Sequence, residues 1–459
     1  MKGFVPTPPA TVDLMVAKLF DGVPATPDLR VLDPGCGEGE FIHGIVRYCQ
    51  AHQRPLPRIT GVELDPGRAA TAKHRFASVP RVEIRQADFL RPSTDRFDLI
   101  VGNPPYVSIL GLDVAERASY RSTYSTARGR FDLYVLFFEQ ALRLLASGGR
   151  LVFITPEKFL YVESTRPLRA QLATQRVEEL HFASESTFGE LVTYPLISTI
   201  SAERSGASTR IVRRDGTSIV ARLDTADSWL PLVNGYRAAA GGLTLGDVAL
   251  RVSCGVATGA DQVYVMHESE LTDELRPFAH PTISGRQISN GLTVVSDSVI
   301  LAPYDAAGGL LPERALGALA CYLQAPGRRA LLAARTCAAR KQWYSFHDNL
   351  PLGAMLRPKL LCKDITESPF FVVDERGTIV PRHSVYYVVP ADPSDLAPLA
   401  IYLNSAQATE WLRAHCQRAA KGFLRMQSHV LKRLPLPSSF EPRLGALARC
   451  SGELQAVPA

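Results

Sequence analysis

Four consecutive residues, Asn103-Pro104-Pro105-Tyr106, have the side chains needed to hold a flat, nitrogen-bearing ring. The asparagine carries a carbonyl acceptor and Pro104 fixes its own backbone, so two oxygens can point into one pocket. Two converging acceptors suit an NH2 group, and Tyr106 adds a flat face on which a heteroaromatic ring could stack. The alternative is a proline-rich turn with an incidental tyrosine.

The element that must position these four residues is the apolar run at 97–102. Its composition predicts a buried strand, and the strand must end at Asn103 because neither following proline can donate a ladder hydrogen bond. Ligands of open α/β sheets bind beyond the carboxyl ends of the strands. The asparagine is therefore expected at a functional edge.

A glycine loop follows another short strand, at residues 30–33. Gly35, Cys36 and Gly37 lie between this strand and a helix expected at 41–46, an arrangement that lets backbone N–H groups approach a ligand. The dinucleotide fingerprint needs a third glycine at position 40, which is Glu40. The loop thus disfavours a nicotinamide dinucleotide and favours a zwitterionic or cationic ligand.

Two further strands end in acids. The strand at 59–64 carries Glu63, thirty residues after Asp33, where a carboxylate can accept both hydroxyls of a ribose; helix capping is the alternative role. The strand at 82–86 is followed by Asp88 and Phe89, which could bind the amino group and the face of an adenine.

The remaining pattern completes an α/β domain. Thr7 is expected to cap a helix at 11–20, a helix at 133–145 is expected to stop at Gly148-Gly149, and a fifth strand is expected at 150–155. Five strands alternating with helices predict a doubly wound, Rossmann-like parallel sheet. From about residue 205 the pattern changes to strands at 210–223 and then to an α+β domain with helices at 310–324 and 396–412. With a hinge at Gly241-Gly242, the expected domains are 1–240 and 241–459.

Composition narrows the class of protein. A chain of 459 residues with 46% apolar and 21% charged residues is expected to be globular, with two or three domains. It has no apolar run long enough to span a membrane and no signal peptide, so we expect a cytoplasmic protein. Its eight cysteines are scattered without zinc spacing, which predicts reduced thiols and no metal site.

Basic residues are concentrated in the second half. Residues 328–363 hold eight Lys or Arg against one acid, and residues 413–433 hold six against none, although the net charge is only +6. Such runs suit either a solvated face or a phosphate-binding surface. In the second run, Gly422 interrupts a helical pattern, which predicts a loop that frees Lys421 and Arg425 to contact phosphates or base edges of DNA.

The motifs in this order resemble the S-adenosylmethionine-dependent DNA adenine-N6 methyltransferases of the TaqI type, over roughly residues 1–200. The matching stretches are Thr7-Pro8, Asp33-Pro34-Gly35-Cys36-Gly37, Gly61-Val62-Glu63-Leu64-Asp65-Pro66, Ala87-Asp88-Phe89, Asn103-Pro104-Pro105-Tyr106 and Asp132-Leu133-Tyr134. The second half is similar to the TaqI-like C-terminal specificity domain at Gly255-Val256-Ala257-Thr258-Gly259, Ile283-Ser284-Gly285-Arg286, Arg357-Pro358-Lys359-Leu360 and Tyr402-Leu403-Asn404-Ser405.

The resemblance implies a role for each candidate residue. Thr7 and Asp33 would lie near the methionine part of the cofactor, Glu63 on its ribose and Asp88 on its adenine amine. Phe89 and Phe137 would pack against that adenine, and the cofactor site would also include Gly35, Cys36, Gly37 and Pro105. Phe188 would be a second aromatic around the target base; an ordinary core phenylalanine is the alternative.

The implied reaction is methyl transfer from S-adenosylmethionine to N6 of an adenine rotated out of duplex DNA. The Asn103 side-chain oxygen and the Pro104 carbonyl would accept the amine hydrogens, and Tyr106 would hold the ring. Catalysis would rest on positioning and electrostatics, without a metal. The expected partners are double-stranded DNA and a separate cognate restriction endonuclease; because the motifs begin at Thr7, no nuclease is expected before them.

Two other functions remain open. Asn-Pro-Pro-Tyr also occurs in methyltransferases that modify guanine in ribosomal RNA or glutamine in release factors. A short peptide substrate needs no large basic second domain, which argues against the glutamine enzymes. A DNA-binding protein with a vestigial methylase fold is the other alternative, and the intact Asn103 argues against it.

Overall fold

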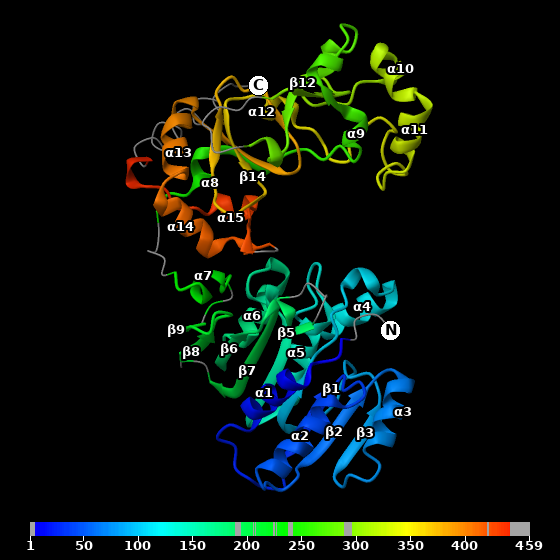
Figure 1. Ribbon diagram of the computed structural model, residues 1–459, viewed down its shortest axis with the longest axis vertical. Coiled ribbons are helices and arrows are strands. Elements are labelled where there is room, and N and C mark those ends of the chain that lie inside the picture. Colours follow the sequence, from blue (N-terminus) through cyan, green and yellow to red (C-terminus); the bar gives the residue numbers. More distant parts are fainter. Residues whose placement is uncertain are drawn as a thin grey trace, which may run out of the picture. The chain divides into compact units, whose positions relative to one another are not determined.

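The computed structural model describes residues 5–188, 194–204, 206, 208–223, 225, 227–236, 242–288, 296–419 and 422–440. The chain divides into two compact units, Met1–Arg237 and Ala238–Ala459 (Figure 1). Among the described residues, no helix is long and apolar enough to cross a membrane.

The first unit is built on a nine-stranded sheet in the order β3-β2-β1-β4-β5-β7-β6-β8-β9. Strands β1 to β5 pair in parallel, as the alternation of strands and helices predicts. Strand β7 lies between β5 and β6, antiparallel to both, which the sequence did not indicate. The bounds are β1 Arg30–Pro34, β2 Arg58–Glu63, β3 Val82–Gln86, β4 Phe97–Gly102, β5 Leu145–Pro156, β6 Gln175–Phe182, β7 Pro195–Arg204, β8 Thr209–Val212 and β9 Ser218–Ala221.

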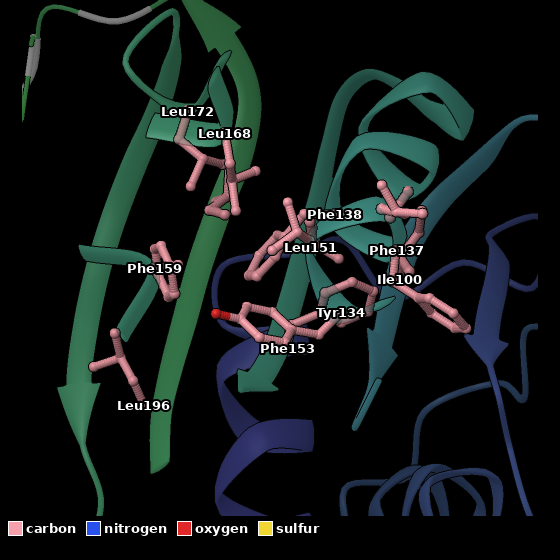
Figure 2. Packing of buried hydrophobic residues seen from close by; sticks show 14 of the residues in the cluster. Ile100, Tyr134, Phe137, Phe138, Leu151, Phe153, Phe159, Leu168, Leu172 and Leu196 are labelled. Carbon is pink, nitrogen blue, oxygen red and sulfur yellow. The ribbon is translucent and has the colours of Figure 1, made fainter. Parts of the chain in front are cut away.

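Helices cover both faces of this sheet because successive strand residues point to opposite sides. In β4, Leu99 and Val101 join the cluster formed with α1 and α2, whereas Ile100 joins the cluster formed with α5 and α6. Figure 2 shows Tyr134 and Phe138 of α5 beside Phe153 of β5. The helix bounds are α1 Pro9–Phe20, α2 Glu40–Ala51, α3 Pro66–Arg75, α4 Val114–Thr123, α5 Leu133–Leu144, α6 Arg166–Leu172 and α7 Leu230–Val233. The doubly wound α/β fold is thereby confirmed.

Two local expectations in this unit are wrong. Thr7 does not cap α1, whose N-cap position is Pro8 and has no side-chain cap bond. Gly148-Gly149 does not end α5 but lies within β5, where the pairing with β4 jumps from Leu145 to Arg150. A Cβ on Gly149 would stand 2.8 Å from the Asp98 carbonyl oxygen, so the glycine permits a β-bulge against the neighbouring strand.

The second unit contains three small sheets, in the orders β10-β18-β14-β16, β11-β13-β12-β17 and β15-β20-β19. This arrangement agrees with the expected α+β class. The strands are β10 Ala249–Cys254, β11 Val265–His267, β12 Ala279–Ile283, β13 Ser298–Leu301, β14 Lys359–Lys363, β15 Ile365–Thr366, β16 Phe371–Asp374, β17 Val380–Pro381, β18 Val385–Pro390, β19 Gln417–Arg418 and β20 Leu424–Arg425. The helices are α8 Leu245–Val248, α9 Asp261–Tyr264, α10 Ala318–Gln324, α11 Pro326–Ala333, α12 Leu352–Met355, α13 Leu396–Leu403, α14 Ala406–His415 and α15 Ser428–Lys432.

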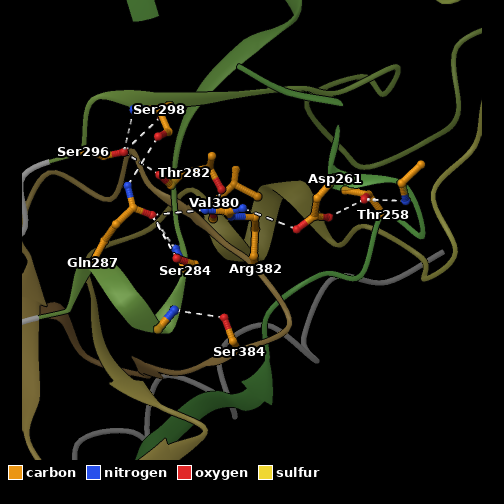
Figure 3. Close-up of polar contacts among 12 residues, drawn as sticks. Thr258, Asp261, Thr282, Ser284, Gln287, Ser296, Ser298, Val380, Arg382 and Ser384 are labelled. Carbon is orange, nitrogen blue, oxygen red and sulfur yellow. Dashed lines mark hydrogen bonds and ion pairs between the residues drawn. The ribbon is translucent and has the colours of Figure 1, made fainter. Parts of the chain in front are cut away.

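Two of the stretches that resemble a specificity domain, residues 255–259 and 283–286, both contact residues 382–384, which follow β17. A Cβ on Gly255 would stand 2.4 Å from the Arg382 carbonyl oxygen, so only glycine allows this approach. The Gly285 N–H donates to Ser384 Oγ at 2.9 Å. Arg382 also donates to two residues that closely follow these stretches, Asp261 Oδ2 at 3.3 Å and Gln287 Oε1 at 3.1 Å (Figure 3). The motif glycines thus serve packing.

Both helices expected in the second unit differ from the prediction. Only the end of 310–324 is α-helical, as α10, and 396–412 is divided into α13 and α14. The division falls at Asn404 and Ser405. Asn404 exchanges two hydrogen bonds with the backbone of Phe371, and Ser405 Oγ caps α14 by accepting from the Ala408 N–H.

Candidate functional site

A cavity of about 800 Å³ opens beyond the carboxyl ends of the parallel strands. Most candidate residues of the sequence line it: Thr7, Gly35, Cys36, Glu63, Asp88, Phe89, Asn103, Pro105 and Phe137. Of the candidates in the first unit, those that do not line it are Asp33, Gly37, Pro104, Tyr106 and Phe188. Its volume is within the range of small-molecule and cofactor sites.

The glycine loop gives this cavity a wall of backbone. The N–H groups of Gly35 and Cys36 both donate to the Val62 carbonyl, at 2.7 and 2.9 Å, which ties the loop to β2. Gly35, Gly37 and Gly39 have φ of +72°, +56° and +90°, a conformation that other residues adopt only with strain. The loop therefore needs these glycines for its shape.

Glu63 connects the glycine loop to the next helix. Its side chain is 5% exposed, and Oε2 accepts from the Gly37 N–H at 2.9 Å. Oε1 accepts from the Asp65 N–H at 2.8 Å and from Arg68 Nη2 at 3.0 Å. Asp65 in turn caps α3, so capping belongs to Asp65 and not to Glu63. A carboxylate can accept about four hydrogen bonds, so these three leave room for one more.

Asp33 is a buried carboxylate, 1% exposed, at the end of β1. Neither of its oxygens has a hydrogen-bond partner among the described residues. Burial, and next the negative charge of Glu63, raise the pKa of Asp33 well above its usual range. A buried acid without a partner is stabilised by a neighbouring cation. Asp33 does not itself line the cavity, but Gly35 and Cys36 close to it in sequence do, so this part of the site suits a positively charged ligand group.

The cavity offers an acidic rim and an aromatic slot. Glu38, Glu40, Asp88 and Glu116 line it together with Glu63, against the single described lining arginine, Arg68. Phe89 and Phe137 lie with ring centroids 4.9 Å apart, and Asp88 Oδ1 accepts from the Leu90 N–H at 2.9 Å. Acids together with two rings fit the cationic, adenine-bearing S-adenosylmethionine.

Asn103 is held by the amino-terminal segment. Its Nδ2 donates to the Val5 carbonyl at 3.0 Å and to Thr7 Oγ1 at 3.1 Å. These two bonds use both amide hydrogens, so Oδ1 is the atom that this side chain offers to a ligand. Because Asn103 lines the cavity, the site presents an acceptor at the end of β4.

Tyr106 and Phe188, neither of which lines the cavity, contact each other edge to face. Their centroids are 6.5 Å apart with planes at 88°, and Tyr106 makes a second edge contact with Tyr134. The Tyr106 hydroxyl donates to the Ile154 carbonyl at 3.4 Å. Burial raises the pKa of Tyr106, so its phenol stays neutral. Phe188 also packs against the core cluster of α1 and α2.

Sequence reasoning missed several lining residues. Val5 and Arg68 act through contacts with Asn103 and Glu63, and Tyr120 of α4 reaches the cavity beside Asp88. Burial and the charge of Asp88 raise the pKa of Tyr120 to about 12. The available signals were the Val5-Pro6 step, which forces an extended backbone, and the position of Arg68 in the first turn after a strand.

Of the two residues predicted to contact DNA, the structure of the second unit describes only Arg425. Lys421 lies outside the described residues. Arg425 is exposed in β20, which pairs with β15 and β19, so this part of the expected loop is a strand. In the run at 328–363, Arg335 and Lys359 are buried: Arg335 donates to backbone carbonyls, and Lys359 pairs with Asp374 at 2.5 Å. These two basic residues therefore serve the fold.

Each of the two units contains a region that matches a known protein family. Residues 63–188 match the Eco57I restriction-modification methylase family, and residues 323–436 match the TaqI-like C-terminal specificity domain. The chain is 29% identical to the type II methyltransferase M.PaeR7I of Pseudomonas aeruginosa, over 89% of this chain and 81% of the relative. It is 27% identical to M.XhoI of Xanthomonas vasicola, over 89% and 86% of the two chains. Among solved structures, the type IIG restriction endonuclease BpuSI aligns at 14% sequence identity and a TM-score of 0.46. The alignment covers 98% of this chain and 61% of the BpuSI chain.

Proposed function

We propose that this chain, which carries an Eco57I-type restriction-modification methylase domain and a TaqI-like C-terminal specificity domain, methylates N6 of adenine at a specific site in duplex DNA. The two family matches confirm the resemblance of its motifs, and its relatives are type II methyltransferases. The enzyme acts as the modification partner of a separate restriction endonuclease, on DNA in the cytoplasm. Its domains are residues 1–240 for methyl transfer and 241–459 for target recognition.

The observation that carries the adenine assignment is the acceptor presented by Asn103. Bonds to Val5 and Thr7 occupy the amide nitrogen, which leaves Oδ1 for a ligand at the end of β4. The exocyclic amine of adenine is a planar donor of two hydrogens, and its lone pair is delocalised into the ring. Acceptance of those hydrogens by Asn103 Oδ1 and the Pro104 carbonyl makes the nitrogen pyramidal and nucleophilic.

Bound S-adenosylmethionine would supply an electrophilic methyl group. As N6 bonds to the methyl carbon, the sulfonium C–S bond would break, S-adenosylhomocysteine would leave, and the methylated amine would release one proton to solvent. The buried Asp33 and the hydroxyl of Thr7 would hold the methionine end of S-adenosylmethionine, and Glu63 would accept from a ribose hydroxyl. Its adenine would lie against Phe89 and Phe137, which contact each other, and Asp88 would accept from the adenine amine. Gly35, Cys36, Gly37 and Pro105 shape the remaining wall.

The aromatic pair supports the extruded base. Tyr106 offers the ring face that replaces the lost stacking, worth a few kcal/mol, and Phe188 holds Tyr106 by an edge contact. The reaction needs the base outside the duplex because a stacked adenine cannot reach the cavity. Residues of the second domain, Lys421 and Arg425 among them, bind the flanking duplex.

The test is to express the chain in a host without adenine methylation and to sequence the genomic DNA for modified bases. We expect N6-methyladenine at one short recognition sequence. N4-methylcytosine in its place, or methyl transfer only to ribosomal RNA or to a release-factor peptide, would overturn the assignment.

The asparagine is tested with purified variants. Asn103→Ala should reduce turnover by about 100-fold, the usual effect of losing one preorganised hydrogen-bonding group, while cofactor affinity changes much less. Gln50→Ala, which removes an exposed amide of α2 outside the cavity, should retain the activity of the natural protein. Near-normal methylation by Asn103→Ala would remove Asn103 from catalysis.

A further inference from the structure

We infer that residues 5–8 hold the Asn103 amide in one orientation and that Thr7 is a positioning residue which acts on the reaction through Asn103. The inference rests on the proposed function, because it is the acceptor Oδ1 that this orientation delivers to the target amine. It gives Thr7 a role beyond the cofactor contact proposed above.

The two bonds to Asn103 Nδ2 differ in what they can do. The Val5 carbonyl can only accept, so the amide nitrogen must face it at 3.0 Å. A rotated amide would bring Oδ1 against this carbonyl, two acceptors without a hydrogen between them. It would also turn the NH2 group into the cavity, where it would meet the NH2 group of the target base. The correct orientation is therefore also the productive one.

Thr7 completes the fixation of the amide. Its hydroxyl accepts the second hydrogen at 3.1 Å, and the residue is 7% exposed, so water competes little for this bond. With both hydrogens used, the carboxamide plane is defined by two points and cannot swing about its last torsion. Oδ1 is then preorganised, which is what electrostatic catalysis requires.

The local sequence explains why these acceptors are in place. Val5 and Thr7 each precede a proline, and a residue before proline is restricted to extended backbone. Pro6 and Pro8 have no N–H group, so Thr7 has the only backbone N–H of residues 6–8 that could attract Oδ1. Helix α1 begins at Pro9, directly after this segment, with Pro8 at its N-cap position.

A cofactor contact and a positioning role predict different kinetics. Thr7 lines the cavity, and its hydroxyl keeps one hydrogen to donate while it accepts from Asn103. Loss of a cofactor contact alone is overcome by raising the cofactor concentration, because only binding is weakened. Loss of the orientation of Asn103 persists at saturation of cofactor and DNA.

The kinetic test compares two variants of Thr7. Thr7→Val keeps the shape but removes the acceptor, and the rate at saturating cofactor and DNA should fall about tenfold, the equivalent of one hydrogen bond of ~1.4 kcal/mol. Thr7→Ser restores the hydroxyl and should recover the rate to within about threefold of the natural protein. Thr71→Val, on the exposed face of α3, is the matched control and should leave the rate unchanged. A saturated rate in Thr7→Val equal to that of the natural protein would overturn the inference.

A second readout is independent of methylation. The chain has five asparagines, so selective ¹⁵N-asparagine labelling gives few side-chain NH2 signals, and Asn103→Ala identifies the pair from Asn103. In the cofactor-free protein, Thr7→Val should shift this pair and accelerate the exchange of one of its hydrogens with water, whereas Thr7→Ser should not. Unchanged signals in Thr7→Val would refute the contact. Shifted signals together with no methylation of any DNA by the natural protein would instead refute the proposed function and leave the contact standing.

Circular dichroism checks whether Thr7→Val folds. If it does not, Thr7→Ala replaces it, because alanine removes the acceptor without placing a methyl group at the position of Oγ1. The expected rate and signal changes are the same. Retention of the natural rate and signals in that variant would overturn the inference equally.

Discussion

Replacement of Glu63 should destabilise the protein even without cofactor. The structure gives Glu63 three donors, the N–H groups of Gly37 and Asp65 and the guanidinium of Arg68, on a side chain that is 5% exposed. Glu63→Ala therefore breaks a buried ion pair and removes the bond that holds the glycine loop. Removal of one partner of a buried ion pair destabilises by about 3 to 5 kcal/mol.

This magnitude predicts a large thermal effect. For a unit of 237 residues, about 3 to 5 kcal/mol corresponds to a fall in Tm of roughly 6 to 20 °C. Glu63→Gln keeps one acceptor oxygen and should fall between the alanine variant and the natural protein. Glu83→Ala is the matched control: Glu83 also pairs with an arginine, Arg85, but is 60% exposed, so its loss should change stability by less than about 1 kcal/mol.

Cofactor binding should weaken in parallel. Loss of the carboxylate acceptor for a ribose hydroxyl, a bond of ~1.5 to 3 kcal/mol, should reduce affinity by roughly 10- to 100-fold, while the rate at saturating cofactor holds. Calorimetric scanning of the cofactor-free variants and titration calorimetry with S-adenosylmethionine measure the two effects separately. A cofactor-free Glu63→Ala protein with the Tm of the natural protein would refute the structural role, and unchanged affinity would remove Glu63 from the cofactor site.

Three further predictions concern charges. Folding raises the pKa of Asp33, so above pH ~3.9 the folded state keeps a proton that the unfolded state releases. Asp33 therefore lowers the stability of the folded state increasingly as pH rises from ~3.9 to the raised pKa. Asp33→Asn should accordingly gain stability over the cofactor-free natural protein from pH ~4 upward while binding S-adenosylmethionine more weakly; a stability difference that is constant with pH would contradict this. Burial lowers the pKa of His415 to about 4, so the natural protein should lose stability as pH falls from ~6.5 to about 4, and thermal scans of His415→Gln should show a flatter pH dependence. The double change Lys421→Ala with Arg425→Ala should weaken DNA binding and lower the slope of log affinity against log salt by about 0.9 per lost phosphate contact, and equal slopes in a fluorescence titration would leave this segment without a role.

The first five strands and the site at their ends were predictable because their signals are local. Four of the five strands end at a proline, an acid or a glycine: β1 at Pro34, β2 at Glu63, β4 at Gly102 and β5 at Pro156. Parallel order then brings these ends together, and nine of the fourteen candidates in the first unit line one cavity. The insertion of β7 between β5 and β6 was not predictable, because an apolar strand does not encode which edge of a sheet it joins.

The wrong predictions for Thr7 and for the helix at 396–412 both arose from contacts between residues that are far apart in the sequence. Thr7 reads as a helix cap, yet its hydroxyl bonds Asn103, 96 positions away. Asn404 fits an uninterrupted helix until its two bonds to Phe371 are known. In the second unit several strands have only two residues, too few for a period-two pattern, so Leu424 and Arg425 could not be recognised as β20.

The fixed amide of Asn103 also has a consequence for fidelity. A base that carries a carbonyl oxygen where adenine carries its amine, such as guanine or the deamination product hypoxanthine, would set that oxygen against Oδ1 without a hydrogen between them. Since Val5 can only accept, the amide cannot turn over to accommodate such a base. Discrimination against the wrong purine would thus be exerted after extrusion, by repulsion at the reacting position, and it would add to whatever selection the specificity domain makes in the duplex.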